Sequence, residues 1–214
     1  MLLTKEKAEE IINDYKSNIT DAYRSKLLFI TDLITNDDWT FVIKAHALIE
    51  SVMNELVEVY LEKPEIKEVI GKLPLHGGSG SKISIAKKLH SISSEESRFV
   101  SNFSELRNIL VHRFEYIDFT FDSYVQNLNK EQLEKLNTAL RINANQPDIY
   151  IIERTCNNLQ IKLSYWNAIF NLLVNLIDRI HLKIASDRNE KEAVTTTMGL
   201  ISNVFKDSQK NFTS

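Results

Sequence analysis

Apolar residues recur every three or four positions through most of this chain, the spacing that places them on one face of an α-helix. The first such run predicts a helix over about Thr4–Thr31 or slightly beyond. A turn follows in which Asp37 or Asp38 can cap the next helix. That second helix is predicted over roughly Trp39–Glu62 and ends before Pro64.

The middle of the chain predicts three further helices. The first, about Ser81–His90, follows a glycine-rich loop whose serines can cap it. The second begins at a capping box, in which Ser93 is the N-cap and Glu96 follows three residues later, and it runs to about Phe114. The third is predicted over about Asp122–Arg141.

The strongest helical pattern spans roughly Asn157–Ser186 and is apolar around much of its circumference. Such a helix lies either at the centre of a bundle or in an interface with another subunit. The tail keeps apolar residues at helical spacing, but three consecutive threonines weaken a helix there; the apolar residues are Val194, Met198, Ile201 and Phe205. We therefore divide the chain into a bundle domain, 1–186, and a marginally helical or mobile tail, 187–214.

Composition supports an all-α fold, which we expect to be an antiparallel helical bundle. Five glycines and three prolines in 214 residues are too few for many short strands joined by turns. A net charge of −3 gives no global attraction for nucleic acid, so any RNA contact needs a local patch. Cys156 is the one cysteine, which excludes an intramolecular disulfide. The chain contains no stretch apolar enough to span a membrane and turns charged at once after its N-terminus, so we expect a cytoplasmic protein.

The segment from Glu105 to His112, late in the helix that runs to about Phe114, has the greatest chemical content. Asn108 and His112 are four residues apart and share one helix face, and Arg107 can curl its long side chain toward the same patch. Guanidinium binds phosphate through paired, charge-assisted hydrogen bonds, and imidazole exchanges a proton near neutral pH. Asn108 can orient the histidine or donate to a phosphate oxygen.

Two further residues are second-tier candidates. Glu105 belongs, with Asn108 and His112, to the polar stripe of this helix, and it can orient Arg107 or His112. His46 lies on the second predicted helix, with Glu50 one turn later on the same face. His46 either leans into the site or is a partly buried histidine or one half of a solvated pair.

Basic residues give the region around this segment a modest positive balance. They can guide RNA to the site, but an ordinary solvated helix surface explains them as well. The residues are Lys82, Lys87, Lys88, Arg98 and Arg113. No histidine or carboxylate has a metal-ligand spacing with the single cysteine, so we expect no structural metal site.

The Arg107-Asn108-x-x-x-His112 motif resembles the arginine, polar residue, histidine pattern of the HEPN superfamily. Its position late in a helix of an all-helical chain is also similar to that family. Residues 82–105 and 44–50 resemble HEPN members akin to the mannitol operon repressor.

The resemblance covers about Thr4–Phe114 and extends to the long helix near Trp166. It implies a helical bundle that forms a symmetric homodimer, with the two motifs meeting in a cleft. It further implies a metal-independent endoribonuclease of a toxin–antitoxin, defence or RNA-processing system that cleaves single-stranded or looped RNA. The catalytic residues would be Arg107, Asn108 and His112, with no cofactor or bound metal, and a regulatory protein is an expected further partner.

Two other interpretations stay open. The resemblance equally allows a non-catalytic regulatory or protein-binding dimer, similar to the mannitol repressor group. The motif can also be a coincidence on a helical scaffold. In that case Arg107 pairs with Glu105 or another neighbour, Asn108 bonds to backbone, and His112 sits near the end of its helix.

Overall fold

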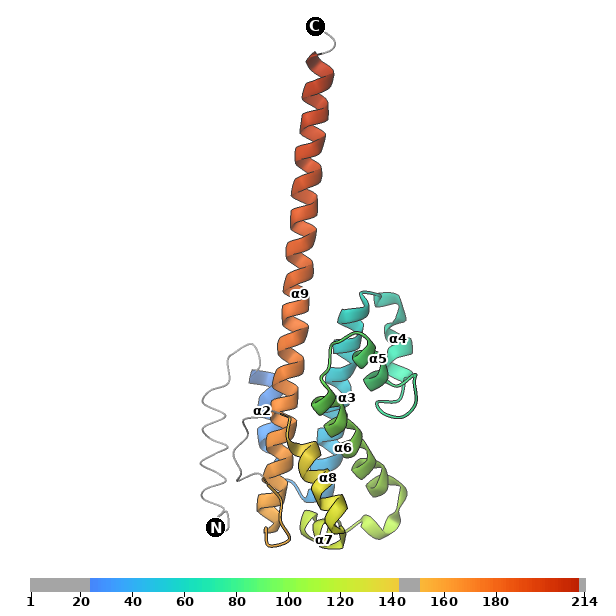
Figure 1. Ribbon diagram of the computed structural model, residues 1–214, viewed down its shortest axis with the longest axis vertical. Helices are drawn as coiled ribbons and strands as arrows, with labels where there is room; N and C mark the ends of the chain where they lie inside the picture. Colours follow the sequence, from blue (N-terminus) through green and yellow to red (C-terminus); the bar gives the residue numbers. More distant parts are fainter. Residues whose placement is uncertain (1–23, 143–150, 212–214) are drawn as a thin grey trace.

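The computed structural model describes residues 24–142 and 151–211, with side chains between Leu28 and Lys191 (Figure 1). The described residues form eight α-helices and two 3-10 helices and contain no strand, which confirms the all-α prediction. The elements are α2 (Arg24–Leu33), α3 (Asp38–Leu61), η1 (Pro64–Ile66), α4 (Lys67–Lys72), α5 (Lys82–Lys88), α6 (Ser94–His112), η2 (Phe114–Tyr116), α7 (Phe121–Asn127), α8 (Lys130–Leu140) and α9 (Asn158–Asn211).

Side-chain caps explain where several of these helices begin. Asp37 accepts a hydrogen bond from the Thr40 amide at 2.8 Å, so of the two candidate caps for α3 it is Asp37 that serves. Ser81 caps α5. Ser93 and Glu96 form the predicted capping box of α6, with reciprocal bonds of 3.1 and 2.8 Å. Each cap satisfies backbone amides that the first helical turn leaves without a partner.

The predicted helix Asp122–Arg141 is instead two helices, α7 and α8. Leu128 is extended, with a ψ angle of 138°, and Asn129 begins α8 with a second capping box to Gln132. A capping residue competes with continued helix because its side chain satisfies the next amides. Helix α6 ends at His112, two residues before the predicted end at Phe114.

Helix α9 forms the centre of the bundle. Every residue from Ile161 to Phe170 is buried, so α9 has neighbours on all sides there. The Trp166 indole is fully buried and donates a hydrogen bond of 2.8 Å to the Ile30 carbonyl of α2. The apolar circumference predicted for this helix therefore reflects burial within the bundle. Burying one such side chain contributes roughly 2–3 kcal/mol.

Helices α3 and α9 run in the same direction, whereas α2 and α6 run opposite to them. Asp38 at the start of α3 pairs with Lys162 near the start of α9, and Glu62 just after α3 pairs with Lys183 further along α9. Glu96, near the start of α6, pairs at 2.6 Å with Arg179, which lies well along α9, so α6 starts beside a late part of α9. The expected antiparallel arrangement thus holds for α2 and α6 but not for the central pair.

A buried polar network fixes α3, α7 and α9 to one another. The Asp38 carboxylate is 3.1 Å from the Lys162 ammonium, and it accepts hydrogen bonds from the Phe121 amide at 3.0 Å and the Asn158 side chain at 2.8 Å. Lys162 also donates to the carbonyl of Asn36. Both charged side chains are almost completely buried and have lost their hydration. Each charge is therefore stabilised mainly by the opposite charge beside it.

Helix α9 runs on to Asn211 and extends beyond the other helices of the bundle (Figure 1). The predicted tail, 187–214, thus begins inside this helix, and the three threonines lie within it. The predicted helix over residues 4–23 and the side chains of the tail after Lys191 lie outside the described residues. None of the helices in the part of the chain described here is both long and apolar enough to cross a bilayer.

Candidate functional site

The orientation of α6 exposes its polar stripe. Phe99, Phe103, Leu106 and Leu110 are all buried against the bundle, so the helix is fixed about its own axis. Residues on the opposite side of a helix held in this way must face solvent. The motif therefore lies at the exposed C-terminal end of a firmly packed helix.

Arg107 and Asn108 contact each other directly. The Arg107 guanidinium donates a hydrogen bond of 3.1 Å to the side-chain oxygen of Asn108. Arg107 is half-buried and Asn108 is exposed. The bond shows that the long arginine side chain does curl toward the asparagine face, as its length allows. The guanidinium has five N–H groups in all, so others stay available to a ligand.

His112 is the last residue of α6 and is exposed, one turn beyond Asn108. It has no hydrogen-bond partner among the described residues. Glu105 is also exposed, but it lines a groove of about 570 Å³ between α6 and α8, together with Glu131 and Lys135. Glu105 makes no ion pair with Arg107 within the described part of the chain. The Arg107–Glu105 pair expected if the motif were a coincidence is therefore not formed there.

His46 does not join this exposed group. Its side chain is 7% exposed and shares a hydrogen bond of 3.1 Å with the Ser104 hydroxyl, which lies on the inner side of α6. Its ring packs beside Phe103. Burial, followed by the positive charge of Arg107, lowers the pKa of His46 from 6.5 to about 4. The second-tier candidate is therefore a neutral, buried histidine behind the motif.

We expect this depressed pKa to make stability depend on pH. The unfolded chain binds a proton at His46 below pH 6.5, whereas the folded chain does so only below about pH 4. The free energy of unfolding should therefore fall by up to about 3 kcal/mol as the pH falls from 6.5 toward 4. Urea denaturation across this range measures the effect. His46→Gln should flatten the slope, and equal slopes for His46→Gln and wild type would contradict the assignment.

Sequence reasoning missed Ser104, the partner of His46. Ser104 follows the buried Phe103 and is 2% exposed, so it belongs to the inner side of α6. A serine beside a core position, with a histidine on a neighbouring helix, gives little signal in sequence alone. The pairing depends on how α3 and α6 pack.

Lys82, one of the basic residues that could guide RNA, is also buried. The Lys82 side chain is fully buried, and its ammonium is 2.8 Å from the Glu50 carboxylate. It therefore stabilises the contact between α3 and α5 and does not face a ligand. Lys87, Lys88, Arg98 and Arg113 are exposed.

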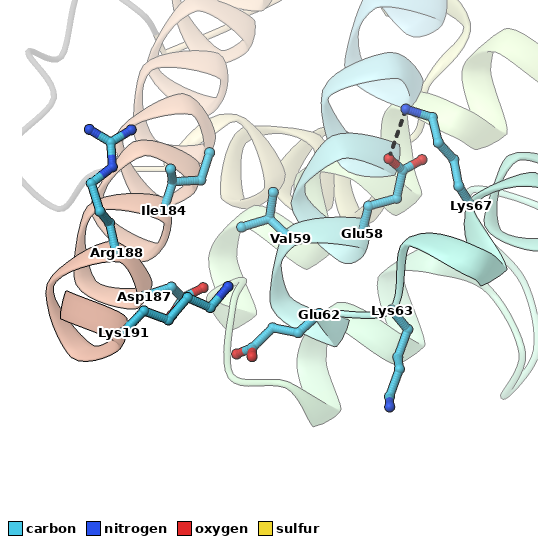
Figure 2. Close-up of a pocket in the computed structure, with 9 residues that line it drawn as sticks. All are labelled: Glu58, Val59, Glu62, Lys63, Lys67, Ile184, Asp187, Arg188 and Lys191. Atoms are coloured by element: carbon cyan, nitrogen blue, oxygen red, sulfur yellow. Dashed lines mark ion pairs between the residues drawn. The ribbon is translucent and has the colours of Figure 1, made fainter. Parts of the chain in front are cut away.

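A surface groove of about 700 Å³ lies far from the motif, where the end of α3 meets α9 (Figure 2). Its walls mix acidic and basic residues, and Lys67 pairs with Glu58 across its edge at 3.2 Å. Ile184 and Val59 supply its apolar part. None of the candidate residues lies here, and the mixed charges select no class of ligand.

The motif provides one guanidinium, one amide and one imidazole per chain, at Arg107, Asn108 and His112. In the described residues, no three histidine, cysteine or carboxylate side chains gather closely enough to hold a metal ion. Comparisons with family models, with curated proteins and with solved structures give no match. The chemistry of the site must therefore be judged from its own residues.

Proposed function

We propose that this chain is a HEPN-type endoribonuclease that cleaves single-stranded or looped RNA without a metal ion. The observation that carries the proposal is the grouping of Arg107, Asn108 and His112 on the exposed end of α6, with Arg107 hydrogen-bonded to Asn108. A phosphate group can approach all three side chains from solvent. The resemblance of the motif to the HEPN pattern adds to this support.

Each residue has a role in cleavage by the neighbouring 2′-hydroxyl of the RNA. Arg107 holds the scissile phosphate and stabilises the negative charge that develops on its oxygens. His112 removes the proton from the 2′-hydroxyl, whose oxygen then attacks phosphorus, or it donates a proton to the departing 5′-oxygen. Asn108 positions Arg107. The products are a 2′,3′-cyclic phosphate and a 5′-hydroxyl.

One chain supplies only one such histidine, whereas cleavage benefits from a base and an acid together. A symmetric pair of chains would provide both, because the partner's copy of the motif would face the first across a two-fold axis. The proposed nuclease is therefore a homodimer with a composite site.

One observation favours a second candidate, a non-catalytic regulatory dimer. Three exposed carboxylates lie close to the motif in the sequence, at Glu105, Glu115 and Asp118. These negative charges repel RNA phosphates and lower RNA affinity. A protein partner with basic residues would be favoured by the same charges.

The test is an RNA cleavage assay in excess EDTA, with total RNA and a structured transfer RNA as substrates. The wild type should leave cyclic-phosphate ends, and Arg107→Ala should abolish cleavage while its circular dichroism spectrum stays unchanged. Arg188→Ala is the matched control, because Arg188 is an exposed arginine of α9 that lines the groove far from the motif, and it should retain activity. Absence of cleavage by the wild type, or equal loss in the Arg188 variant, would favour the regulatory dimer.

A further inference from the structure

Phe114 has the most exposed large apolar side chain in the described part of the chain. It is 87% exposed and begins η2, two residues after His112. The next two phenylalanines along the chain, Phe119 and Phe121, are buried in the bundle, with ring centroids 5.3 Å apart. A single exposed apolar residue is ordinary, so what Phe114 does depends on the groups around it.

The backbone holds the Phe114 ring away from the bundle. The chain leaves α6 at Arg113, whose φ and ψ angles of −129° and 111° are extended, and then turns through η2. The amide of Ile117 donates to the carbonyl of Phe114 at 3.2 Å, which closes the turn. The ring contacts no other aromatic ring among the described residues, so its faces are open to a ligand.

The ring lies close to the motif. Two residues of chain span at most about 7 Å, so the Cα atoms of His112 and Phe114 are no further apart than that. Asn108 lies one helical turn before His112, and the Arg107 guanidinium donates a hydrogen bond to its side chain. A strand whose phosphate binds at Arg107 can therefore bring a neighbouring base to the Phe114 ring.

The charges beside the ring indicate what it binds. Arg113 and Glu115 have side chains 58% and 71% exposed, and their charged groups are 3.8 Å apart. An exposed pair of this kind is weak, so the Arg113 guanidinium can exchange the carboxylate for a phosphate. The Glu115 carboxylate repels phosphates but not an uncharged base, so stacking of a base on the ring offsets that repulsion. An exposed ring beside a cation is the combination with which proteins bind single-stranded nucleic acid.

We propose that Phe114 is a base-stacking residue, whose ring binds one unpaired base of an RNA strand next to the phosphate held by the motif. Every base has a π face, whereas the bases of a duplex are stacked within it. The contact therefore selects unpaired over paired RNA and does not select one sequence. It also holds the strand in position beside His112. This inference rests on the proposed function, because the motif defines where the strand runs.

Binding of a strand that cannot be cleaved tests the stacking separately from the chemistry. A fully 2′-O-methylated single-stranded oligonucleotide lacks the attacking hydroxyl, and an abasic strand of the same length lacks the bases. Fluorescence anisotropy in EDTA measures the Kd of the full chain for each. Phe114→Leu keeps an apolar side chain but removes the ring, so it should weaken binding of the base-bearing strand at least about fivefold. It should bind the abasic strand as the wild type does.

Two further variants control for apolar area and for folding. Phe114→Trp keeps an aromatic face and should bind the base-bearing strand as tightly as the wild type or more tightly. Phe29→Leu is the matched control, because Phe29 is a 45% exposed phenylalanine of α2, and it should leave both affinities unchanged. Circular dichroism checks that each variant is folded.

The outcomes separate this proposal from the proposed function. A selective loss of affinity for the base-bearing strand in Phe114→Leu, with no cleavage of natural RNA by the wild type, would uphold the stacking and reject the nuclease. A wild type that does not bind the base-bearing strand, or a Phe114→Leu variant that binds it equally well, would overturn the stacking even if RNA is cleaved. An equal loss for both strands would make the role of Phe114 structural and would also overturn it.

Discussion

His112→Ala is expected to lower the rate constant of RNA cleavage about 10²- to 10⁴-fold, the usual contribution of a general acid or base. The variant should keep wild-type stability, because the His112 side chain is exposed and has no partner among the described residues. Single-turnover cleavage in EDTA measures the rate constant, and urea denaturation measures the stability.

A second exposed histidine provides the control for that experiment. His90 follows α5 with a φ angle of 53°, a left-handed conformation that asparagine tolerates well. His90→Asn should therefore cleave RNA at the wild-type rate. If His112→Ala cleaves as fast as His90→Asn, His112 is not the proton carrier and the catalytic proposal fails.

Asp38→Ala is expected to lower the free energy of unfolding by about 3–5 kcal/mol, the range found when one partner of a buried ion pair is removed. The substitution leaves the buried Lys162 ammonium without its carboxylate. It also removes the acceptor for the Phe121 amide and the Asn158 side chain. Urea denaturation or the thermal midpoint measures the loss.

The neighbouring aspartate is a matched control. Asp37 is exposed, and its side chain caps the first turn of α3. Asp37→Ala should therefore cost only about 1 kcal/mol, the usual value of an N-cap. A loss in Asp38→Ala no larger than in Asp37→Ala would show that the buried network contributes little. Should Asp38→Ala not fold, Asp38→Asn keeps an acceptor for both hydrogen bonds and should be intermediate.

Local signals predicted the helix that carries the motif. The capping box at Ser93 and the buried stripe of α6 are both set by residues close in sequence, so the start of the helix and its buried face followed from spacing, whereas its end was predicted two residues too late. The division between α7 and α8 was missed because Asn129 and Gln132 are unremarkable within a helical pattern. The parallel course of α3 and α9 depends on contacts far apart in the chain, which periodicity does not report.

In the candidate site, too, some features follow from neighbouring residues and others depend on how the helices pack. The proximity of Arg107 and Asn108 follows from their adjacency and from the length of the arginine side chain. The burial of His46 does not follow from neighbouring residues, because the packing of α3 against α6 decides whether its side chain lies inside the bundle or on the surface. The predicted helix end at Phe114 is wrong, because the backbone becomes extended at Arg113 and the exposed Phe114 belongs to η2.

The central place of α9 has a consequence for synthesis on the ribosome. Helix α3 leaves the ribosome long before residues 161–170, which fill the middle of the bundle, have been translated. Until then the buried face of α3, including Phe41 and Ile49, has no α9 to cover it. We therefore expect the nascent chain to expose apolar surface until α9 has emerged, and such surface makes a folding chain prone to aggregate and dependent on chaperones.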